Sequence, residues 1–419
     1  MGAPISIDFE ALDALAPVIN PVAKRFVAAG HHLYLVGGIV RDLSLGRLSG
    51  FDIDFTTDAH PKAIKTLLGP LAEHVWTQGE RFGTIGAQID GHALEITTHR
   101  AERYDPESRK PIVTFGDQLD EDLSRRDFTI NAMAIEVPDR TLHDPYGGAA
   151  DLEAKVLRTP LSPEVSFGDD PLRMLRAARF IARFELSVDE KVAGAATELA
   201  GRLDIVSVER VNDEIERLLA TDDPSAGFDF IARTGLLAHA VAPMSADEVI
   251  VVRELATAPG NALVRRAGLL WPTDVAAVVR RLRYSNQDRA ETTALVRGVR
   301  DWVDHDRSSP AAARLLIAKT GADAPRSLAC NVGAATSIDS RRRLAAGRLV
   351  EVIDELVAAG DVGPYDSPLS GSDIMELLDV EPGPVVGRAQ KMLRRHRLDH
   401  GPFDATEAAV LLRRWYAEQ

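Results

Sequence analysis

The most constraining feature of the sequence is a pair of glycines followed shortly by two closely spaced aspartates. Residues 33–36 form a short apolar run that ends at Gly37 and Gly38, and residues 39–45 then have helical character up to Gly46. This order predicts a buried strand, a glycine turn and a helix. Two adjacent glycines let a ligand approach the backbone closely, and a helix N-terminus favours an anion such as phosphate.

The two aspartates lie on a second predicted strand. Residues 51–56 read FDIDFT and alternate apolar with polar positions, so Asp52 and Asp54 share one face. Neighbouring carboxylates repel each other unless a cation lies between them, and magnesium, which combines carboxylates with substrate phosphates, fits this need. Arg41, in the preceding helix, adds positive charge. Each motif alone is more often a plain turn or polar face, but together they predict one crevice for a metal and a phosphate chain.

The composition predicts a multidomain protein with much helix. The 419 residues exceed one typical domain, and 45% hydrophobic residues suffice for a sizeable core. Since no apolar run approaches the roughly 18 residues that span a bilayer, and no secretory signal is apparent, we expect a soluble, cytoplasmic protein. The single cysteine, Cys330, excludes an internal disulfide and is expected to be a buried, small hydrophobic residue.

The net charge of −14 argues against a nucleic-acid partner, but binding follows local patches rather than the total. Two arginine-rich stretches stand out, and solvated helix faces explain such stretches as often as nucleic acid does. The first contains Arg280, Arg281, Arg283, Arg289, Arg297 and Arg300. The second contains Arg388, Lys391, Arg394, Arg395 and Arg397.

Further polar residues follow the two aspartates. Asp90 and Gly91 form a strong hairpin signal between two strand patterns. In the second of these strands, Glu95 is either a third carboxylate facing the first two or an edge-strand charge. Residues 101–120 are polar and broken by prolines, which predicts a mobile loop near a site. A predicted helix from Asp122 carries further polar residues.

In that predicted helix, Asp127 and Asn131 are one turn apart and follow Arg125 and Arg126. This spacing could hold ribose hydroxyls while the arginines bind phosphate oxygens; the alternative is a helix cap and a surface face.

A second arginine pattern occupies residues 167–184. Asp170 and Pro171 predict the start of a helix, and four arginines then form one stripe, Arg173, Arg176, Arg179 and Arg183. Such a stripe needs an anion or acidic side chains opposite it. Asp170 and Arg173 together offer an acceptor and a forked donor that can read the edge of a nucleotide base. Residues 207–219 predict a helix that packs against this stripe.

Taken in order, these segments resemble the motifs of class II tRNA nucleotidyltransferases and bacterial poly(A) polymerases. The resemblance covers residues 30–220 and rests on VGGIVRD, FDIDFTTD, RRDFTINAMA, DPYGGAADL, DDPLRMLRAARF and SVERVNDEIERLL. It implies an α+β fold: a polymerase-beta-like nucleotidyltransferase head with a small mixed sheet, followed by an all-α neck, body and tail. The expected parts are residues 1–150, 151–225, 226–360 and 361–419.

The resemblance also implies roles for the motif residues. Asp52 and Asp54 would hold two magnesium ions, one for the 3′-hydroxyl of the RNA and one for the leaving pyrophosphate. Gly37, Gly38 and Arg41 would bind the triphosphate. Catalysis would then be in-line phosphoryl transfer, in which positioning and charge neutralisation do most of the work.

Nucleotide choice is implied to lie further along the chain. Arg126, Asp127 and Asn131 would contact the ribose and phosphates, which favours ribonucleotides. Asp170 and Arg173 would pair with the Watson–Crick edge of CTP or ATP. Two further arginines would support that helix or bind phosphates, Arg176 and Arg179.

One departure concerns the segment after the neck. Many relatives carry a metal-binding HD phosphohydrolase domain there, whereas this chain has Trp271 and Pro272 where a His-Asp pair is expected. We therefore predict no HD hydrolase activity. The helices would instead form an RNA-binding body and tail, with candidate RNA-binding residues Arg280, Arg281, Arg283, Lys391, Arg394 and Arg395.

The prediction is an enzyme that adds CCA to tRNA 3′ ends from CTP and ATP and releases pyrophosphate. The alternatives are addition of A alone or of CC alone, or poly(A) polymerase activity; residues 101–120 are the expected determinant of the switch from C to A. A tRNA-binding relative without catalysis, and nucleotide transfer to a small molecule or protein, are less favoured, because the two aspartates are intact and the helical half would lack a role.

Overall fold

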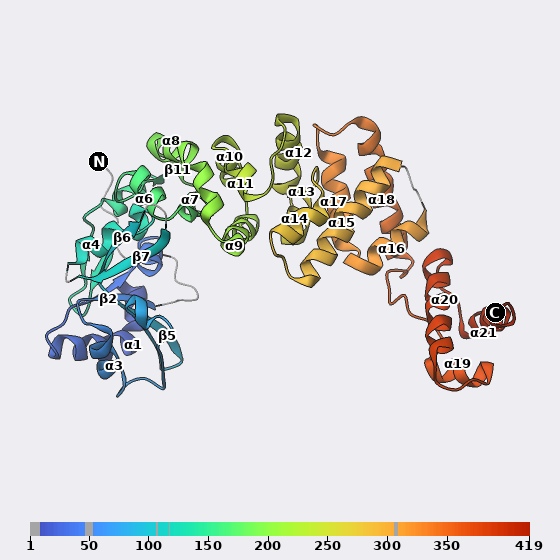
Figure 1. Cartoon of the computed structure of the whole chain (residues 1–419), viewed down its shortest axis with the longest axis horizontal. Helices are drawn as coiled ribbons and strands as arrows, with labels where there is room; N and C mark the ends of the chain where they lie inside the picture. The colour runs from blue at the N-terminus through green and yellow to red at the C-terminus, as the bar shows by residue number, and fades with distance from the viewer. Residues whose placement is uncertain (1–8, 47–52, 106–107, 117, 306–308) are drawn as a thin grey trace. The chain divides into compact units, whose positions relative to one another are not determined.

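The computed structural model describes residues 9–46, 53–105, 108–116, 118–305 and 309–419, and it forms two compact units (Figure 1). One unit comprises Met1–Glu214 with Asp229–Ala240, and the other comprises Ile215–Phe228 with Val241–Gln419. The predicted division into head, neck, body and tail is finer than these two units and stays a prediction. Within the described residues, no helix combines the length and the apolarity that a membrane crossing requires.

The first unit is built on a seven-stranded sheet. Its spatial order is β3 (His74–Trp76), β4 (Thr84–Ile89), β5 (His92–Thr98), β2 (Ile53–Thr57), β1 (Leu33–Val36), β8 (Ala134–Glu136) and β9 (Thr141–His143). β2 and β5 run parallel, and the other neighbours pair antiparallel. The predicted hairpin is confirmed between β4 and β5, where Asp90 and Gly91 both have positive φ, as a tight two-residue turn requires. The small mixed sheet expected for the head is thus present.

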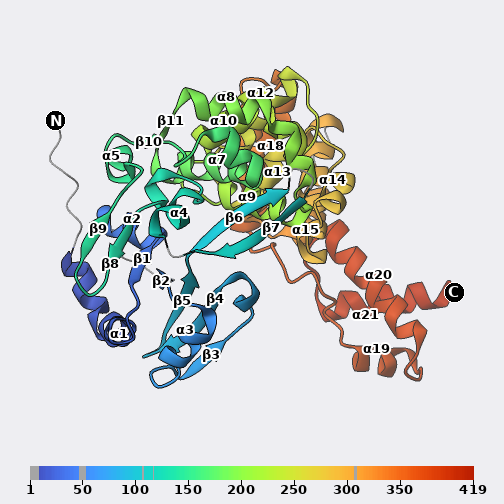
Figure 2. The same ribbon diagram turned by 60° about the vertical axis from the view of Figure 1, so that its left-hand side comes forward.

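Helices cover the sheet on both faces. α1 (Phe9–Ala28) and α3 (Pro61–Leu68) pack together against it (Figure 2). Ile53 and Phe55 of β2 are fully buried. On the face that carries Tyr34 and Val36, α4 (Leu119–Ser124) inserts Leu123 into a small apolar cluster. α2 (Gly38–Ser44) and the 3-10 turn η1 (Glu80–Phe82) complete the periphery.

The prediction of a loop over residues 101–120 is wrong. β6 (Arg100–Asp105) and β7 (Ser108–Phe115) pair antiparallel as a separate two-stranded sheet, with an irregularity between Arg103 and Asp105. Residues 112–115 read IVTF, and this run of β-branched and aromatic residues favours extended backbone more strongly than the neighbouring prolines and charges oppose it. Figure 2 shows the hairpin beside α4, which β6 contacts.

The helix predicted from Asp122 is also only partly correct. α4 ends at Ser124, and Asp127 lies in an irregular segment before the 3-10 turn η2 (Thr129–Asn131). The Asp127 carboxylate accepts a hydrogen bond from the backbone N–H of Phe128, and such a local bond competes with helical hydrogen bonding.

The remainder of the first unit is mainly helical. Its elements, together with those that reach the boundary between the units, are α5 (Gly148–Glu153), α6 (Pro163–Asp169), α7 (Leu172–Phe184), α8 (Glu190–Glu198), η3 (Ala200–Ile205), α9 (Val208–Leu219), α10 (Ser225–Arg233) and α11 (Leu236–Ala240). Two short strands that the sequence did not predict, β10 (Val156–Leu157) and β11 (Ser187–Val188), pair parallel. The Asp144 carboxylate accepts hydrogen bonds from the backbone N–H groups of Gly148 and Ala149, so the turn before α5 caps the start of that helix.

The second unit is helical throughout its described residues. The helices are α12 (Ala246–Ala256), α13 (Ala262–Leu269), α14 (Val275–Arg281), α15 (Asn286–His305), α16 (Pro310–Thr320), α17 (Asp323–Ala334), α18 (Ser340–Ala358), α19 (Gly371–Leu378), α20 (Pro384–His400) and α21 (Ala405–Ala417). Trp271 is buried, 6% exposed, as an apolar core residue. The prediction that Cys330 is buried is wrong, because its side chain is exposed on α17. A lone cysteine carries no periodic signal that assigns it to a helix face.

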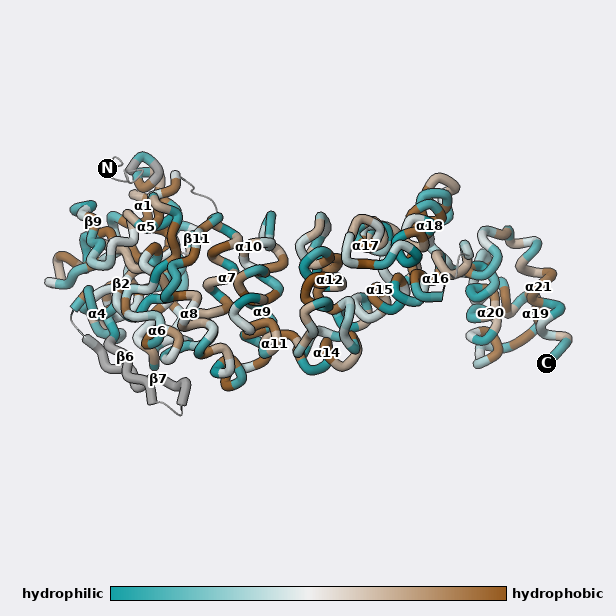
Figure 3. The backbone as a smooth tube through the Cα atoms, turned by 90° about the horizontal axis from the view of Figure 1, so that it is seen from above, coloured by the Kyte–Doolittle hydropathy of each residue, from teal (hydrophilic) through white to brown (hydrophobic). Residues whose placement is uncertain are grey.

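The last three helices share a small core of their own. Ile374, Leu393 and Leu412, one from each helix, pack together, while α20 is hydrophilic along much of its length (Figure 3). α20 also packs on α16, where the buried Asp361 carboxylate bridges Arg314 and Arg397 at 2.7 and 2.6 Å.

Candidate active site

The predicted strand, glycine turn and helix are confirmed, and they lie beside the start of β2. β1 and β2 pair antiparallel with Leu35 opposite Phe55, so β1 leads into the turn next to Asp54. Gly37 has a φ of 77° and a ψ of −132°, a conformation that L side chains rarely adopt. The glycine at this position therefore fixes a turn that comes directly against the strand with the carboxylate.

Two carboxylates meet on one face of the sheet. Asp54 is half-buried between Ile53 and Phe55, whose side chains are fully buried on the opposite face. Glu95 on β5 is in parallel register with Asp54, so the two side chains share a face, and Glu95 is exposed. Asp52 lies outside the described residues, and its place beside Asp54 stays a prediction. Of the two alternatives for Glu95, the register favours a third carboxylate.

Arg41 lies under the glycine turn and is almost fully buried. Its Nη1 donates to Asn131 Oδ1 at 2.7 Å, and its Nε donates to Asp42 Oδ1 at 2.9 Å. The guanidinium lies 4.4 Å from the ring centroid of Phe184, and a Cβ added at Gly38 would be 3.4 Å from its Nη2. Burial lowers the pKa of Arg41, a cost that Asp42 partly offsets. This arginine is thus placed to hold the turn and Asn131 in position.

Asp127 and Asn131 meet as the spacing predicted, although by a 3-10 turn rather than by a continuous helix. Asn131 Nδ2 donates to Asp127 Oδ1 at 2.9 Å, and Arg176 of α7 donates to Asp127 Oδ2 through Nε at 2.9 Å and Nη2 at 2.6 Å. Burial opposes ionisation of Asp127, but Arg176 and Asn131 outweigh it and hold the pKa at about 2. The carboxylate is therefore charged and links the head segment to the arginine helix.

Arg126 lies directly over Gly37. A Cβ added at Gly37 would be 3.0 Å from Arg126 Nη1, so the guanidinium lies in tight contact with the turn. The fully buried Asp122 binds Arg125 Nη2 at 2.6 Å and Arg126 Nη2 at 3.3 Å; burial alone would raise the pKa of Asp122, but these charges lower it well below its usual range. Arg126 Nε is buried and finds no hydrogen-bond acceptor in the described part of the chain. The guanidinium of Arg126 thus brings positive charge against the turn, as a phosphate site requires.

The predicted base-reading pair is present at the start of α7. α7 begins one residue later than predicted, with Pro171 rather than Asp170 as its N-cap. Asp170 Oδ1 still accepts from the backbone N–H of Leu172 at 3.2 Å, and its Oδ2 lies 3.2 Å from Arg210 Nη2. Arg173 is 9% exposed and donates to Ser166 Oγ at 2.9 Å and to the backbone carbonyl of Arg125. Both groups already bind protein partners, so reading a base requires Arg173 to exchange a protein acceptor for a base edge.

The arginine stripe faces acids, as its charge required. Arg179 Nε donates to Glu214 Oε2 at 2.7 Å, and Arg176 Nη1 is 3.8 Å from Glu214 Oε1. Glu214 belongs to α9, so the predicted packing against the stripe is confirmed for the part of residues 207–219 that lies in the first unit, up to Glu214. A continuous polar network therefore runs from the glycine turn through Arg41, Asn131, Asp127 and Arg176 to Glu214.

Sequence reasoning missed three members of this arrangement. Asp122, Ser166 and Glu214 are isolated polar residues without a motif, and only the fold brings them to their arginines. The one available signal was general: arginines on a helix stripe that is otherwise apolar need buried acids nearby.

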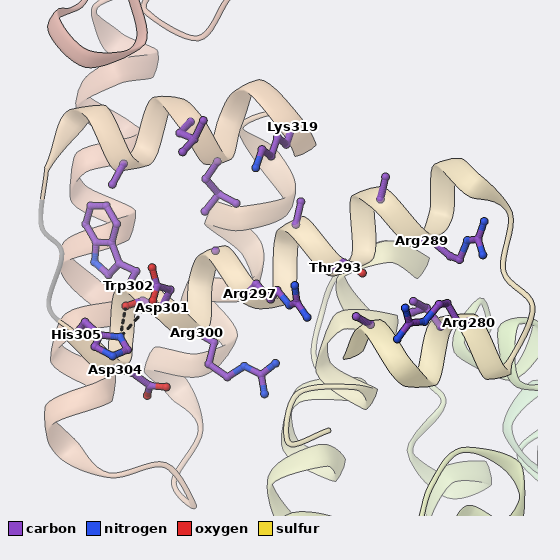
Figure 4. A pocket seen from close by; sticks show the side chains of 18 of the residues that line it. Arg280, Arg289, Thr293, Arg297, Arg300, Asp301, Trp302, Asp304, His305 and Lys319 are labelled. Atoms are coloured by element: carbon purple, nitrogen blue, oxygen red, sulfur yellow. Dashed lines mark hydrogen bonds and ion pairs between the residues drawn. The ribbon is translucent and has the colours of Figure 1, made fainter. Parts of the chain in front are cut away.

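A second candidate site is a basic groove of about 1340 Å³ in the second unit, between α14, α15 and α16 (Figure 4). Its basic lining residues are Arg280, Arg289, Arg297, Arg300 and Lys319. Of these, Arg300 donates to the carbonyls of Trp271 and Thr273 at 2.9 and 3.2 Å, and burial lowers its pKa. Asp301, Asp304 and His305 occupy one end, so the positive charge is concentrated along the other part of the groove.

The six predicted RNA-binding residues do not form one cluster. Arg280 lines the groove, whereas Arg281 donates to the carbonyl of Val241 and Arg283 lies outside the groove lining. Lys391 and Arg394 are exposed on α20. Arg395 is exposed as well and pairs with Asp399 at 2.8 Å one turn later. Each placement leaves RNA binding by these residues a prediction.

Comparison with known proteins identifies similar sequences across the chain. Residues 33–158 match the family model described as "Poly A polymerase head domain", and residues 185–247 match "Probable RNA and SrmB- binding site of polymerase A". A CCA-adding enzyme of Geobacillus kaustophilus is 30% identical over 373 residues, which cover 85% of this chain and 89% of that enzyme. A CCA-adding enzyme of Lacticaseibacillus paracasei is 39% identical over 221 residues, 52% of this chain and 54% of that one.

Solved structures are similar in fold. The CCA-adding enzyme of Bacillus stearothermophilus in complex with CTP has a TM-score of 0.67 at 24% identity and covers 95% of this chain and 96% of its own. The Thermotoga maritima CCA-adding enzyme complexed with tRNA has a TM-score of 0.66 at 19% identity, over 99% and 100% of the two chains. The α+β head and the helical remainder are thus a known architecture.

Proposed function

Because the chain belongs to the family of CCA-adding enzymes and bacterial poly(A) polymerases, we propose a two-metal mechanism by which its head adds CCA to the 3′ end of tRNA. The chain is a tRNA nucleotidyltransferase that uses CTP and ATP. The observation that carries the mechanism is the register of β1, β2 and β5. It brings the glycine turn, Asp54 and Glu95 side by side on one sheet face.

The carboxylate set fits magnesium. Asp54 and Glu95 offer oxygen ligands on adjacent strands, and the predicted partner Asp52 precedes Asp54 by one strand repeat. Two magnesium ions bound there would lower the pKa of the RNA 3′-hydroxyl and neutralise charge on the leaving pyrophosphate. In the transfer, the 3′-oxygen bonds to the α-phosphorus, the bond from that phosphorus to pyrophosphate breaks, and the hydroxyl proton passes to water.

The chain's own groups position the nucleotide. Gly37 and Gly38 allow the phosphates to approach the backbone, and Arg126, held by Asp122, supplies charge and a free Nε. Arg41 holds Asn131, and Asn131 with Asp127 would take the ribose hydroxyls. Preorganised charge of this kind is the main protein contribution to phosphoryl transfer.

Base selection is proposed for Asp170 and Arg173. Arg173 sits one turn after Asp170, and both side chains are held by groups of the same unit, through Arg210 and Ser166. Arg176 and Arg179, fixed by Asp127 and Glu214, keep this helix in place. The pair presents a donor and an acceptor to a Watson–Crick edge.

The RNA acceptor is proposed to contact the second unit through the basic groove and α20. Although the chain as a whole is acidic, the groove groups positive charges that match a phosphate backbone. These charges belong to Arg280, Arg289, Arg297 and Lys319. Lys391, Arg394 and Arg395 would extend this surface on α20. Since tRNA and both nucleotides are used in the cytoplasm, we place the protein there.

The function is tested by incubating the purified protein with tRNA that lacks CCA, with CTP alone, ATP alone or both, and sequencing the 3′ ends. We expect CC with CTP alone and CCA with both nucleotides; long adenosine tails from ATP would indicate a poly(A) polymerase instead. Asp54→Asn should lower incorporation by more than about a hundredfold, since even outer-shell partners of a metal cost up to that much. The exposed Asp139→Asn serves as the control, and unchanged incorporation by Asp54→Asn would exclude the mechanism.

A further inference from the structure

A hollow of about 290 Å³ lies on the sheet; it shares Glu95 with the proposed metal site, whereas its other lining residues have no role in the nucleotide site described above. Its walls include Trp76, Phe82, Gln78, Thr84, Gly86 and Glu95. The volume is at the small end of ligand pockets, which suits one nucleoside rather than a triphosphate. All of these residues belong to the first unit.

Strand register shows how the hollow relates to the carboxylates. Trp76 pairs with Gly86, Gly86 pairs with Glu95, and Glu95 pairs with Asp54. Residues paired across neighbouring strands share a face, so these four form one row across the sheet. The row runs from the tryptophan at the edge strand β3 to the proposed metal ligands at β2.

Gly86 gives the row its shape. A Cβ added at Gly86 would overlap the Trp76 indole, so the ring occupies the space that a side chain at this position would fill. Phe82 contributes a second aromatic wall and is 38% exposed, with the guanidinium of Arg81 4.4 Å from its ring centroid. A partly buried tryptophan and an exposed phenylalanine in a polar hollow are the elements of a base-stacking platform.

The hollow lies on the opposite side of Asp54 from the triphosphate site. The glycine turn follows β1, which is one neighbour of β2. Glu95 lies on β5, which is the other neighbour of β2, and the hollow extends from there over β4 and β3. In-line phosphoryl transfer places the attacking hydroxyl opposite the leaving pyrophosphate. The group bound in the hollow is therefore on the side from which the hydroxyl attacks.

We propose that this hollow binds the 3′-terminal nucleoside of the RNA acceptor and that Trp76 and Phe82 stack on its base. The proposal rests on the proposed function. During CCA addition the terminal base changes with each nucleotide added, so the site has to accept different bases. Stacking meets this requirement because every base has a π-face, while Gln78 and Thr84 offer adaptable hydrogen bonds.

The test combines a protein change with an RNA change. Trp76→Ala is compared with wild type on an acceptor minihelix that ends either in an intact nucleotide or in an abasic one. Each single change should raise the Kd and KM for RNA about tenfold, and the two together should raise them no further, because both remove the same stacking contact. Trp76→Phe should recover most of the loss, and the affinity for CTP should stay unchanged.

Two controls separate stacking from folding. Val75→Ala lies on the same edge strand but on the opposite face, and it should leave the RNA Kd unchanged. Phe82→Ala removes the second aromatic wall and leaves the contact between Trp76 and Gly86 in place, so it replaces Trp76→Ala as the test variant if that protein does not fold. Its effect on RNA affinity should also vanish on the abasic acceptor.

The proposal is overturned if the effects of Trp76→Ala and of the abasic nucleotide on the RNA Kd multiply. It is also overturned if Trp76→Ala weakens CTP binding and RNA binding equally. RNA affinity is measured by fluorescence anisotropy without nucleotide, so this outcome does not depend on turnover. Wild-type incorporation of CMP and AMP is measured separately. If the enzyme adds CCA but the two changes multiply, only the proposed nucleoside site is refuted. If the wild-type enzyme adds no nucleotide, the proposed function is refuted, and the RNA affinities still test the nucleoside site.

Discussion

At the scale of single residues, Asp127 couples folding to pH. Its pKa is about 2 in the folded protein, against an ordinary value of 3.8, because Arg176 and Asn131 outweigh the effect of burial. A carboxyl with a depressed folded pKa contributes stability that is complete above its unfolded pKa and is lost as the pH falls through the folded one. We expect Asp127→Asn to lower the free energy of unfolding by about 2 kcal/mol at pH 7 and by about half of that at pH 3.

The measurement is urea denaturation of both proteins at the two pH values, with the exposed Asp139→Asn as the matched control. If Asp127→Asn lowers the free energy of unfolding equally at pH 7 and pH 3, the effect comes from packing and not from the charge of Asp127.

The same residues show what the sequence could predict about the site. Asp127 and Asn131 do meet, although the predicted helix between them does not form, because the irregular segment and the short 3-10 turn after it also bring Asn131 Nδ2 within hydrogen-bond distance of Asp127. Glu214 could not be assigned, because its partner Arg179 is distant in the sequence. Pairing of isolated charges depends on the tertiary fold, which short-range patterns do not encode.

At the scale of elements, the packing of α7 on α9 depends on one carboxylate. Glu214 is 3% exposed and lies between Arg179 and Arg176. Removing one partner of a buried ion pair leaves uncompensated charge, so Glu214→Ala should lower the free energy of unfolding by about 3 kcal/mol or more. Glu214→Gln keeps an acceptor and the side-chain shape, and it should cost less.

Thermal and urea unfolding of the two variants test this, and the exposed Glu198→Ala is the control. If Glu214→Ala and Glu198→Ala have the same stability, the ion pair contributes nothing to the packing of these helices. A further consequence is specific to the site: Glu214→Ala should also weaken CTP binding, because Arg176 would lose part of its support.

Elements with strong local patterns were predicted, and those with conflicting patterns were not. The β4–β5 hairpin follows from the Asp90-Gly91 turn, and α7 follows from Asp170-Pro171 and its periodic arginines. In residues 100–115 the prolines and charges suggested a loop, whereas strand pairing between β6 and β7 satisfies the backbone hydrogen bonds. Pairing between two segments is a non-local effect, and it determines that residues 100–115 form strands.

At the scale of the whole molecule, the order of head and helical remainder was predictable, but the basic groove was not. The sequence marked Arg280 to Arg300 as one stretch, yet Lys319 joins the groove from α16, and Arg281 turns away to the carbonyl of Val241. A surface formed by three helices depends on how they pack. Helical periodicity alone assigns faces to single helices and cannot combine them.

The groove leads to a prediction about salt, because the chain carries a net charge of −14 and its proposed partner is an anionic polymer. If the groove neutralises RNA phosphates, each lost contact should lower the slope of log Kd against log salt concentration by somewhat less than 1. Arg289→Ala combined with Arg297→Ala should therefore weaken tRNA binding most at low salt and reduce the slope by about 1.5. Arg326→Ala on α17 removes a cation that pairs with Asp354 and does not line the groove, so it should leave the slope unchanged.

Anisotropy titrations of tRNA between low and physiological salt measure both the Kd and its salt slope. If the double variant keeps the wild-type slope, the RNA does not contact the groove, and α20 is the remaining basic surface that binds it.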